Sequence, residues 1–298
     1  MVQKINKSAR LRKTLSLRDT DAYRLVDGAR DSLPGIYLET FAGRRLFSTE
    51  SSTLPSELRA WADQDPNLST YWKRLDQQDK EPPSHLSGPA QNDPFEIREQ
   101  GARFLVNLQS GYSQGIFLDQ RDNRARVRVR CEPEHTILNT FAYTGAFSVT
   151  AALGGACTTT LDLSQPYLDW TRENFTLNGI DASAHHFCRG DTFHWLRRFS
   201  KQGRQFTGLI LDPPTFSRDD TGRVFRAERD YGSLVQLASE CLEPGGWLLC
   251  TTNCRRLPAA AFTRMVSSAL PSGVQLTSHP MPPDFTGTPY LKTLFVET

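Results

Sequence analysis

Apolar and polar residues follow one pattern in the first part of the chain and another in the second. Up to about residue 130, short apolar runs are separated by turn residues such as Gly, Pro and Asp. This pattern is typical of short strands joined by tight turns. After Thr136, apolar strands alternate strictly with segments of helix length. The sequence therefore predicts a small α+β domain followed by an α/β domain.

The second pattern contains five strand–helix units and a closing pair of strands. We expect the strands at 136–143, 157–163, 184–191, 206–214, 247–253, 274–280 and 291–298. Helical connections between strands of one sheet favour parallel pairing, with helices on both faces. The prediction is an α/β fold with a Rossmann-like, doubly wound, mostly parallel sheet of seven strands.

The chain is expected to divide into four segments. These are a basic N-terminal arm at 1–20, a small α+β domain at 21–92, a hairpin with a connecting helix at 93–130, and the α/β domain at 131–298. The arm holds six Lys or Arg residues and one acid. We expect this arm to be partly helical or disordered, and to be either a solvated tail or a segment that contacts phosphate.

Composition adds the class of protein and a hint about partners. The chain of 298 residues can build a core without disulfides or metals, and its six cysteines form no CxxC pair, so we expect no metal site. It has no apolar run of transmembrane length and no apolar secretory signal, so we expect a cytoplasmic protein with no membrane partner. Arg supplies 28 of the 35 basic residues. That excess suits phosphate and base contacts, and it also follows from a GC-rich genome.

The first strand of the α/β domain ends in a segment suited to a small ligand. In doubly wound sheets, ligands bind beyond the carboxyl ends of the strands. Here the strand runs into NTFAYTGAFS at 139–148, with Gly145 at the turn into a helix. A small residue there lets backbone N–H groups approach a ligand closely. The segment lacks GxGxxG, which weakens a dinucleotide interpretation.

Acids follow the next two strands. Asp162 ends the second strand, at a place where an acid typically accepts hydrogen bonds from an adenosine ribose, and Asp191 ends the third, where it can accept from an adenine amino group. Each can instead cap the helix that follows, as Ser164 can. Two spaced acids and a short Gly turn favour an adenosine-containing cofactor.

The fourth strand ends in the sharpest local signal of the chain. Four apolar residues run directly into Asp212-Pro213-Pro214. Each Pro fixes its φ angle, and the first keeps Asp212 out of helical geometry. We expect a rigid lip that presents Asp212 and backbone carbonyls to a planar amine or base, although a plain surface turn is the alternative.

These segments resemble a known family. NTFAYTGAFS, LDLSQPYLDWTRENFTLNG, GDTFHWL and LILDPPTFSR are similar to motifs I to IV of class I S-adenosylmethionine-dependent methyltransferases. GYSQGIFLDQRDNR at 111–124 resembles the segment before the catalytic domain of bacterial large-subunit ribosomal RNA methyltransferases, above all the C5-cytosine enzyme I and the N7-guanine half of the fused enzyme K/L. The resemblance covers about residues 20–298. Many relatives of enzyme I begin with an RNA-binding PUA domain, which is not visible in this sequence.

The resemblance implies an enzyme that uses S-adenosyl-L-methionine to methylate a base of RNA, in large-subunit ribosomal RNA. It implies that Asp212, Pro213, Pro214 and Phe216 hold the base, with Phe216 stacked on its face. The implied cofactor residues precede the α/β domain or follow its first four strands: Asp119, Gln120, Arg121, Asn139, Phe141, Tyr143, Gly145, Asp162, Leu163, Ser164, Asp191, Thr192 and Asp212.

The reacting atom is the open point. In the C5-cytosine relative a Ser-Cys-Ser run after the fifth strand supplies a nucleophile, whereas this chain has Thr-Asn-Cys-Arg at 252–255. Cys254 is the candidate nucleophile, and Arg255 and Arg256 are expected to lower its pKa. Asn253 occupies the matching position and suits a purine edge. We favour guanine N7, which needs no deprotonation, over cytosine C5.

Arg121, Arg124 and Arg128 would share one face of a helix, where they suit the RNA backbone, or a solvated helix without a partner. Two other functions are weighed against the methyltransferase. One is an NAD-dependent oxidoreductase on a similar sheet, which the missing GxGxxG disfavours. The other is a non-catalytic RNA-binding relative, which the intact acids disfavour.

Overall fold

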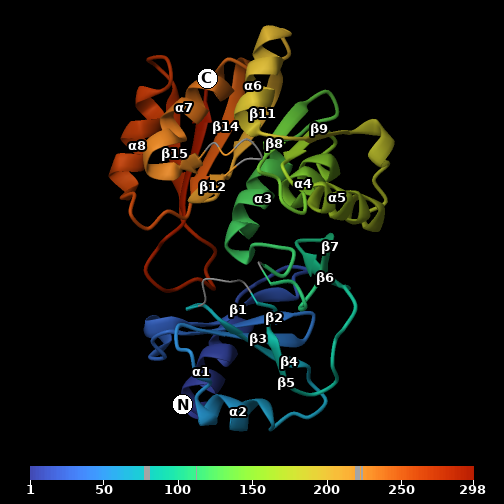
Figure 1. Ribbon diagram of the computed structural model, residues 1–298, viewed down its shortest axis with the longest axis vertical. Coiled ribbons are helices and arrows are strands. Elements are labelled where there is room, and N and C mark those ends of the chain that lie inside the picture. Colours follow the sequence, from blue (N-terminus) through green and yellow to red (C-terminus); the bar gives the residue numbers. More distant parts are fainter. Residues whose placement is uncertain (77–80, 112, 219–221, 223) are drawn as a thin grey trace. The chain divides into compact units, whose positions relative to one another are not determined.

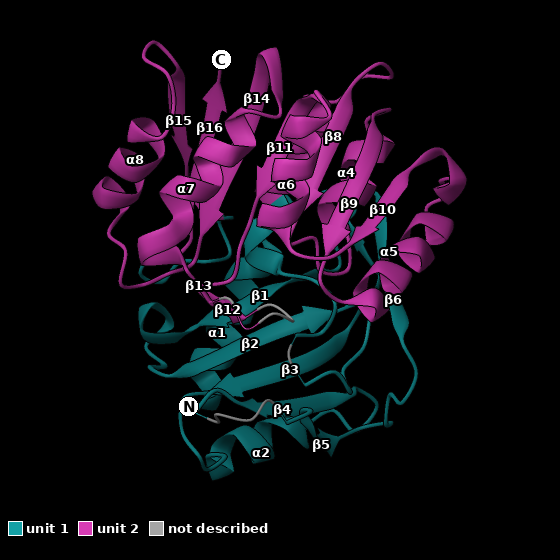
Figure 2. Cartoon of the chain, turned by 45° about the horizontal axis from the view of Figure 1, so that its top comes forward, with its two compact units in different colours: residues 1–121, 282–288 teal, residues 122–281, 289–298 magenta. Residues whose placement is uncertain are grey.

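The structure is a computed structural model that describes residues 1–76, 81–111, 113–218, 222 and 224–298. Residue 112 of the segment 111–124 lies outside the described residues. The chain forms two compact units (Figure 2). Unit 1 comprises residues 1–121 and 282–288, and unit 2 comprises residues 122–281 and 289–298. Each unit is described by itself below.

Unit 1 is built on a five-stranded sheet in the order β1-β2-β3-β4-β5. Neighbouring strands are antiparallel except for β3 and β4, which are parallel and joined through a helix. A separate hairpin follows. The elements of unit 1 are α1 (Val2–Lys13), β1 (Ala22–Asp27), η1 (Gly28–Asp31), β2 (Ile36–Phe41), β3 (Arg44–Thr49), α2 (Ser56–Ala62), β4 (Thr70–Arg74), β5 (Ser84–Ser87), the hairpin strands β6 (Phe95–Glu99) and β7 (Ala102–Val106), and η2 (Leu118–Gln120).

The first residues of the chain do not form the expected basic arm. Residues 2–13 are the helix α1, whose Ile5 is fully buried in the core of unit 1 with Leu58 and Trp61. Arg12 is buried as well, and its guanidinium makes an ion pair of 2.7 Å with Asp31. The segment belongs to the folded unit because one face of its helix is apolar. The many charged residues in the sequence concealed that face.

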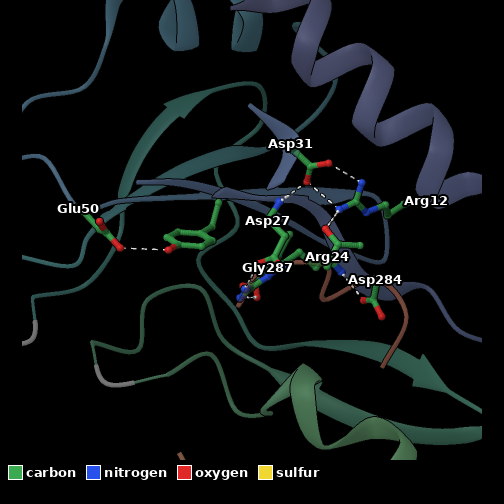
Figure 3. Close-up of polar contacts among 10 residues, drawn as sticks. Arg12, Arg24, Asp27, Asp31, Glu50, Asp284 and Gly287 are labelled. Carbon is green, nitrogen blue, oxygen red and sulfur yellow. Dashed lines mark hydrogen bonds and ion pairs between the residues drawn. The ribbon is translucent and has the colours of Figure 1, made fainter. Parts of the chain in front are cut away.

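A short segment from the C-terminal part of the sequence also belongs to unit 1. We call residues 282–288 the insert; the sequence had placed them in the α/β domain. Figure 3 shows two of its contacts: Asp284 accepts from the Arg24 backbone N–H at 2.8 Å, and the Gly287 N–H donates to Asp27 at 2.5 Å. Asp284 also forms an ion pair with Arg121. These contacts join chain segments more than a hundred residues apart into one unit.

Unit 2 contains the predicted seven-stranded sheet, in the order β10-β9-β8-β11-β14-β16-β15, whose strands are all labelled in Figure 2. Figure 1 colours the same chain along its sequence. The first five strands are parallel, and β16 is antiparallel to both of its neighbours. The strands are β8 (Thr136–Thr140), β9 (Cys157–Asp162), β10 (His186–Arg189), β11 (Phe206–Leu211), β14 (Leu242–Thr252), β15 (Gln275–His279) and β16 (Lys292–Glu297). The mostly parallel, doubly wound prediction is therefore confirmed.

Helices cover both faces of this sheet because successive strand residues point to opposite sides. In β11, Leu209 and Leu211 pack in one core with α6, α7 and α8, whereas Ile210 packs in another with α3 and α4. The helices are α3 (Arg121–Val129), α4 (Ala146–Leu153), α5 (Gln165–Leu177), α6 (Thr192–Lys201), α7 (Ala227–Ser239) and α8 (Ala259–Ser268), with η3 at Ala182–Ala184. A hairpin that the sequence did not predict, β12 (Phe216–Arg218) with β13 (Val224–Arg226), lies between β11 and α7 along the chain.

Candidate functional site

The carboxyl ends of the five parallel strands meet at one edge of the unit 2 sheet. The strand register pairs Thr140 of β8 with Leu161 of β9 and with Leu211 of β11, and it pairs Leu211 with Cys250 of β14. After β8, the chain adds β9 and β10 on one side of it, and then β11 and β14 on its other side. The direction in which strands are added therefore reverses between β8 and β11. This is the switch point at which doubly wound sheets bind their ligands.

The loop after β8 holds an unusual backbone conformation. Phe141 and Tyr143 both have a φ of 51°, which is rare for residues with a side chain. Gly145 has a φ of 74°, and a Cβ placed there would lie 2.2 Å from Thr171 Cγ2 of α5. Only glycine fits at that position. Strained backbone of this kind clusters at ligand sites because the surrounding structure must hold it in place.

Asp162 at the end of β9 fastens this loop. Its carboxylate accepts from the Tyr143 backbone N–H at 2.8 Å and from the Ser164 N–H at 2.9 Å. Burial raises the pKa of Asp162, and the hydrogen bonds from backbone N–H groups partly oppose that rise. The Leu163 N–H is a third such donor. A carboxylate has about four acceptor positions, so Asp162 keeps room for a ligand hydroxyl.

Asp191 and Asn139 have structural partners of their own. Asp191 is the N-cap of α6, where its Oδ1 accepts from the His194 N–H at 2.8 Å, so the capping role is present. Asn139 is buried, and its amide donates to Ser148 Oγ at 2.9 Å. A buried amide that holds α4 against the strands positions the loop after β8. The ligand contacts proposed for Asp191 and Asn139 stay predictions.

The Asp212-Pro213-Pro214 lip is bound to the neighbouring strand end. Thr251 of β14 donates from Oγ1 to Asp212 Oδ1 at 2.5 Å. The buried Tyr231 hydroxyl lies 2.9 Å from both the Leu211 and the Thr251 carbonyl oxygens. Tyr231 therefore ties the first turns of α7 to the ends of two strands. Sequence reasoning missed it, although an aromatic residue early in the helix after this strand was the available signal.

Beyond the lip, unit 2 contains a cavity of about 590 Å³. It brings together Phe216, Asn253 and Cys254, which the sequence had singled out from two separate segments. The Thr215 hydroxyl donates to Asn253 Oδ1 at 3.0 Å and joins the two segments. The remaining lining residues are Arg226, Glu228, Arg255, Arg256 and Tyr290.

Aromatic rings and guanidinium groups face one another in this cavity. Phe216 is 49% exposed and lines the cavity. The guanidinium of Arg226 lies 5.2 Å from the Phe216 ring centre, and that of Arg255 lies 5.6 Å from the Tyr290 ring centre. Exposed rings beside arginines form the kind of surface on which nucleic acid bases stack.

Cys254 departs from the expectation of a low pKa. Burial raises the pKa of its thiol, and a hydrogen bond with the Glu228 carboxylate raises it further. Arg255 and Arg256 are exposed residues, and the groups that lower the thiol pKa are backbone N–H groups of Arg256 and Leu257. The prediction that the two arginines would favour the thiolate is therefore wrong.

The predicted arginine face on α3 is also corrected. Arg121 and Arg124 are only 1% and 2% exposed, because Arg121 is neutralised by Asp284 and Arg124 lies over the Phe147 ring at 5.8 Å. Such side chains do not present their charges to an RNA backbone. Asp119 and Gln120 lie in η2 of unit 1, and their role toward a cofactor, like that of Arg121, stays a prediction.

In the part of the chain that the structure describes, no helix has both the length and the apolar character that crossing a membrane requires. Among the same residues, no three His, Cys, Asp or Glu side chains gather in a way that could hold a metal ion.

Comparison with known proteins identifies the family. Residues 58–294 match the model of an S-adenosylmethionine-dependent methyltransferase family. The ribosomal RNA large subunit methyltransferase I of Erwinia tasmaniensis is 34% identical over 280 residues, which are 90% of this chain and 70% of that protein. The ribosomal RNA large subunit methyltransferase K/L of Chromohalobacter salexigens is 38% identical over 70% of this chain and 28% of its own length.

A solved structure agrees with this assignment. A candidate methyltransferase complexed with SAH superposes with a TM-score of 0.89 at 28% identity, and the match covers 100% of this chain and 80% of the other. The tRNA m1G37 methyltransferase of M. jannaschii, at 13% identity and a TM-score of 0.62, shares the fold. The family match replaces the oxidoreductase and non-catalytic alternatives. The chain belongs to the S-adenosylmethionine-dependent methyltransferases and is an enzyme of that class.

Proposed function

We propose that this enzyme methylates a base of large-subunit ribosomal RNA in the cytoplasm, at guanine N7 in preference to cytosine C5. One relative, which matches 90% of this chain, is named ribosomal RNA large subunit methyltransferase I. Another, which matches 70% of this chain, is named ribosomal RNA large subunit methyltransferase K/L. The observation that carries the proposal is the cavity beyond the Asp212-Pro213-Pro214 lip, with its exposed Phe216 and its arginines.

The residues at the strand ends fit S-adenosyl-L-methionine. Asp162 has acceptor capacity for a ribose hydroxyl, and the loop from Phe141 to Gly145 supplies backbone groups for the ligand. Gly145 is needed in this loop because a Cβ there would collide with Thr171. Asp191 lies at the end of the next strand for the adenine. When bound, the cofactor supplies a methyl group already activated on a sulfonium. The protein therefore has to align the acceptor atom and exclude water.

The base is held by the cavity in this proposal. Phe216 stacks on the ring from one side, since its face is exposed and its backbone is fixed in the β12–β13 hairpin. Asp212, Pro213 and Pro214 come directly before Thr215 and Phe216, which line the cavity, and in this proposal they contact the base from the side of the strand ends. Arg226, Arg255 and Arg256 bind the flanking phosphates, which adds affinity without sequence information.

The state of Cys254 favours a ring nitrogen as acceptor. Guanine N7 carries a lone pair in the ring plane, so it would accept the activated methyl group directly, and no residue of the protein has to remove a proton. Methylation at C5 needs a thiolate that adds to C6 and a base that later removes the C5 proton. A buried thiol with a raised pKa, hydrogen-bonded to a carboxylate, is poorly prepared for that step.

The test uses tritiated S-adenosylmethionine and large-subunit ribosomal RNA made by transcription. We expect methyl transfer to ordinary RNA and none to RNA transcribed with 7-deazaguanosine, which lacks N7. Cys254→Ser should retain near-normal transfer. Loss of activity in Cys254→Ser with unchanged cofactor affinity, together with normal transfer to the 7-deaza RNA, would make Cys254 the nucleophile and cytosine C5 the target.

A further inference from the structure

One carboxylate stands among the cations of the cavity. Of the described residues that line it, three are arginines and one, Glu228, is an acid. The Glu228 carboxylate accepts hydrogen bonds from its own backbone N–H and from the Cys254 thiol, and it lies near Arg256 and Arg226. A carboxylate has about four acceptor positions, so Glu228 has capacity to accept further hydrogen bonds from a group in the cavity.

The position of Glu228 is well fixed. It lies in the first turn of α7, half-buried, three residues before Tyr231. The Tyr231 hydroxyl hydrogen-bonds with carbonyl groups of both β11 and β14, which ties this part of the helix to the strand ends. Glu228 lines the same cavity as Asn253, which follows β14.

Glu228 is also held in its charged form. Its pKa is lowered, first by its own backbone N–H, and also by the Cys254 thiol and the nearby Arg256 and Arg226. An ionised carboxylate accepts hydrogen bonds and donates none. At neutral pH this wall of the cavity is therefore selective for donors.

The two candidate bases differ in the donors that they present. The Watson–Crick edge of guanine carries two adjacent donors, N1–H and the N2 amino group, which match the two oxygens of a carboxylate. That edge lies across the ring system from N7, so it remains available while N7 faces the methyl group. Cytosine places its N4 amino donor beside the N3 acceptor, and N3 would meet a carboxylate oxygen with an unfavourable lone-pair contact.

We propose that Glu228 is the specificity-determining residue of the cavity, selecting guanine by accepting hydrogen bonds from N1–H and the N2 amino group. This inference rests on the proposed function, since it assigns the cavity to the target base. It adds the residue that distinguishes guanine from cytosine and from any base that lacks two adjacent hydrogen-bond donors.

The test measures mononucleotide binding to the whole protein by calorimetry, with the 5′-monophosphates of guanosine, inosine and cytidine as probes. Inosine lacks only the N2 amino group. The wild-type protein should bind the guanosine probe about tenfold more tightly than the inosine probe, as expected for one hydrogen bond to a charged group. Glu228→Gln keeps the shape but sets an amide donor against the donors of guanine. It should shrink the guanosine–inosine difference to less than about threefold and improve cytidine binding.

Glu240→Gln is the matched control. It removes the same charge from a residue at the other end of α7, where Glu240 accepts from Ser200 Oγ at 3.0 Å. It should leave all three affinities as in the wild type. Equal binding of the guanosine and inosine probes by the wild-type protein would overturn the inference without any variant. An unchanged preference in Glu228→Gln would overturn it as well.

Methyl transfer by the wild-type protein is measured in parallel and separates the two proposals. If RNA is not methylated but Glu228→Gln loses the guanosine preference, the guanine site stands and the proposed substrate fails. If RNA is methylated at guanine but the variant keeps the preference, the proposed function stands and the role of Glu228 is refuted.

Discussion

Replacing Asp284 should destabilise unit 1 far more than a typical substitution. Its carboxylate is fully buried, receives hydrogen bonds from two nitrogens of Arg121, and accepts the backbone N–H of Arg24 at 2.8 Å. The Asp284→Asn variant keeps the size of the side chain and removes its charge. The guanidinium of Arg121, which is 1% exposed, then loses its counter-ion without gaining access to water.

The expected magnitude follows from that burial. Breaking a buried ion pair by removing one partner costs about 3 to 5 kcal/mol, a large fraction of the roughly 5 to 15 kcal/mol that stabilises an ordinary protein. Asp63→Asn provides the matched control, since Asp63 and Arg59 are each 55% exposed at a separation of 3.9 Å. An exposed pair of this kind contributes less than about 1 kcal/mol.

Urea unfolding followed by circular dichroism measures both variants, and amide exchange of β1 reports on unit 1 alone. We expect Asp284→Asn to speed exchange throughout β1, whose Arg24 N–H loses its acceptor, while Asp63→Asn leaves it unchanged. A double variant with Arg121→Met and Asp284→Leu should be less destabilised than Asp284→Asn, because neither charge of this buried pair remains. A loss below about 1 kcal/mol in Asp284→Asn would refute the argument that the insert is held by this charge pair.

Two further predictions concern the strand ends. Asp162→Asn should weaken S-adenosylmethionine binding by about 1 to 3 kcal/mol in calorimetry, the effect of losing a charged acceptor. Burial raises the pKa of Asp162, so the affinity of the wild-type protein for the cofactor should fall as the pH is lowered through that pKa and the carboxylate is protonated. If this affinity does not depend on pH, or if Asp162→Asn binds the cofactor as the wild type does, Asp162 is not part of the site. Tyr231→Phe should lower the free energy of unfolding by about 1 to 2 kcal/mol. It should also reduce kcat and leave the KM for the cofactor unchanged. Full activity in this variant would show that the strand ends keep their positions without the hydroxyl.

The α/β domain could be predicted from the sequence because its signals are local. Strands such as β11 are continuous apolar runs buried on both faces, and the acids at their ends follow directly in the chain. The parallel pairing was implied by helical connections of ordinary length. Since parallel strands end at the same edge of a sheet, Asp162 and the Asp212 lip could be placed at one edge from the sequence alone.

Charge patterns were a poorer guide, because a sequence shows how many charges a segment has but not where their partners lie. Arg121 looked like part of a basic surface, yet its partner Asp284 comes 163 residues later. Arg12 in the supposed arm is paired with Asp31 in the same way. In both cases a contact distant in sequence converts an apparent RNA-binding charge into a buried structural one.

The chemistry of Cys254 depends on the same kind of distant contact. From the sequence, the two arginines that follow the cysteine were its only visible neighbours, and they predicted a reactive thiolate. The fold instead places Glu228, 26 residues earlier in the chain, against the thiol, while the arginine side chains extend into the cavity. Burial is the larger cause of the raised pKa of the Cys254 thiol, and the Glu228 carboxylate raises it further. The same carboxylate is the hydrogen-bond acceptor that we propose for guanine, so one side chain contributes both to the poor nucleophilicity of Cys254 and to the proposed selection of the base.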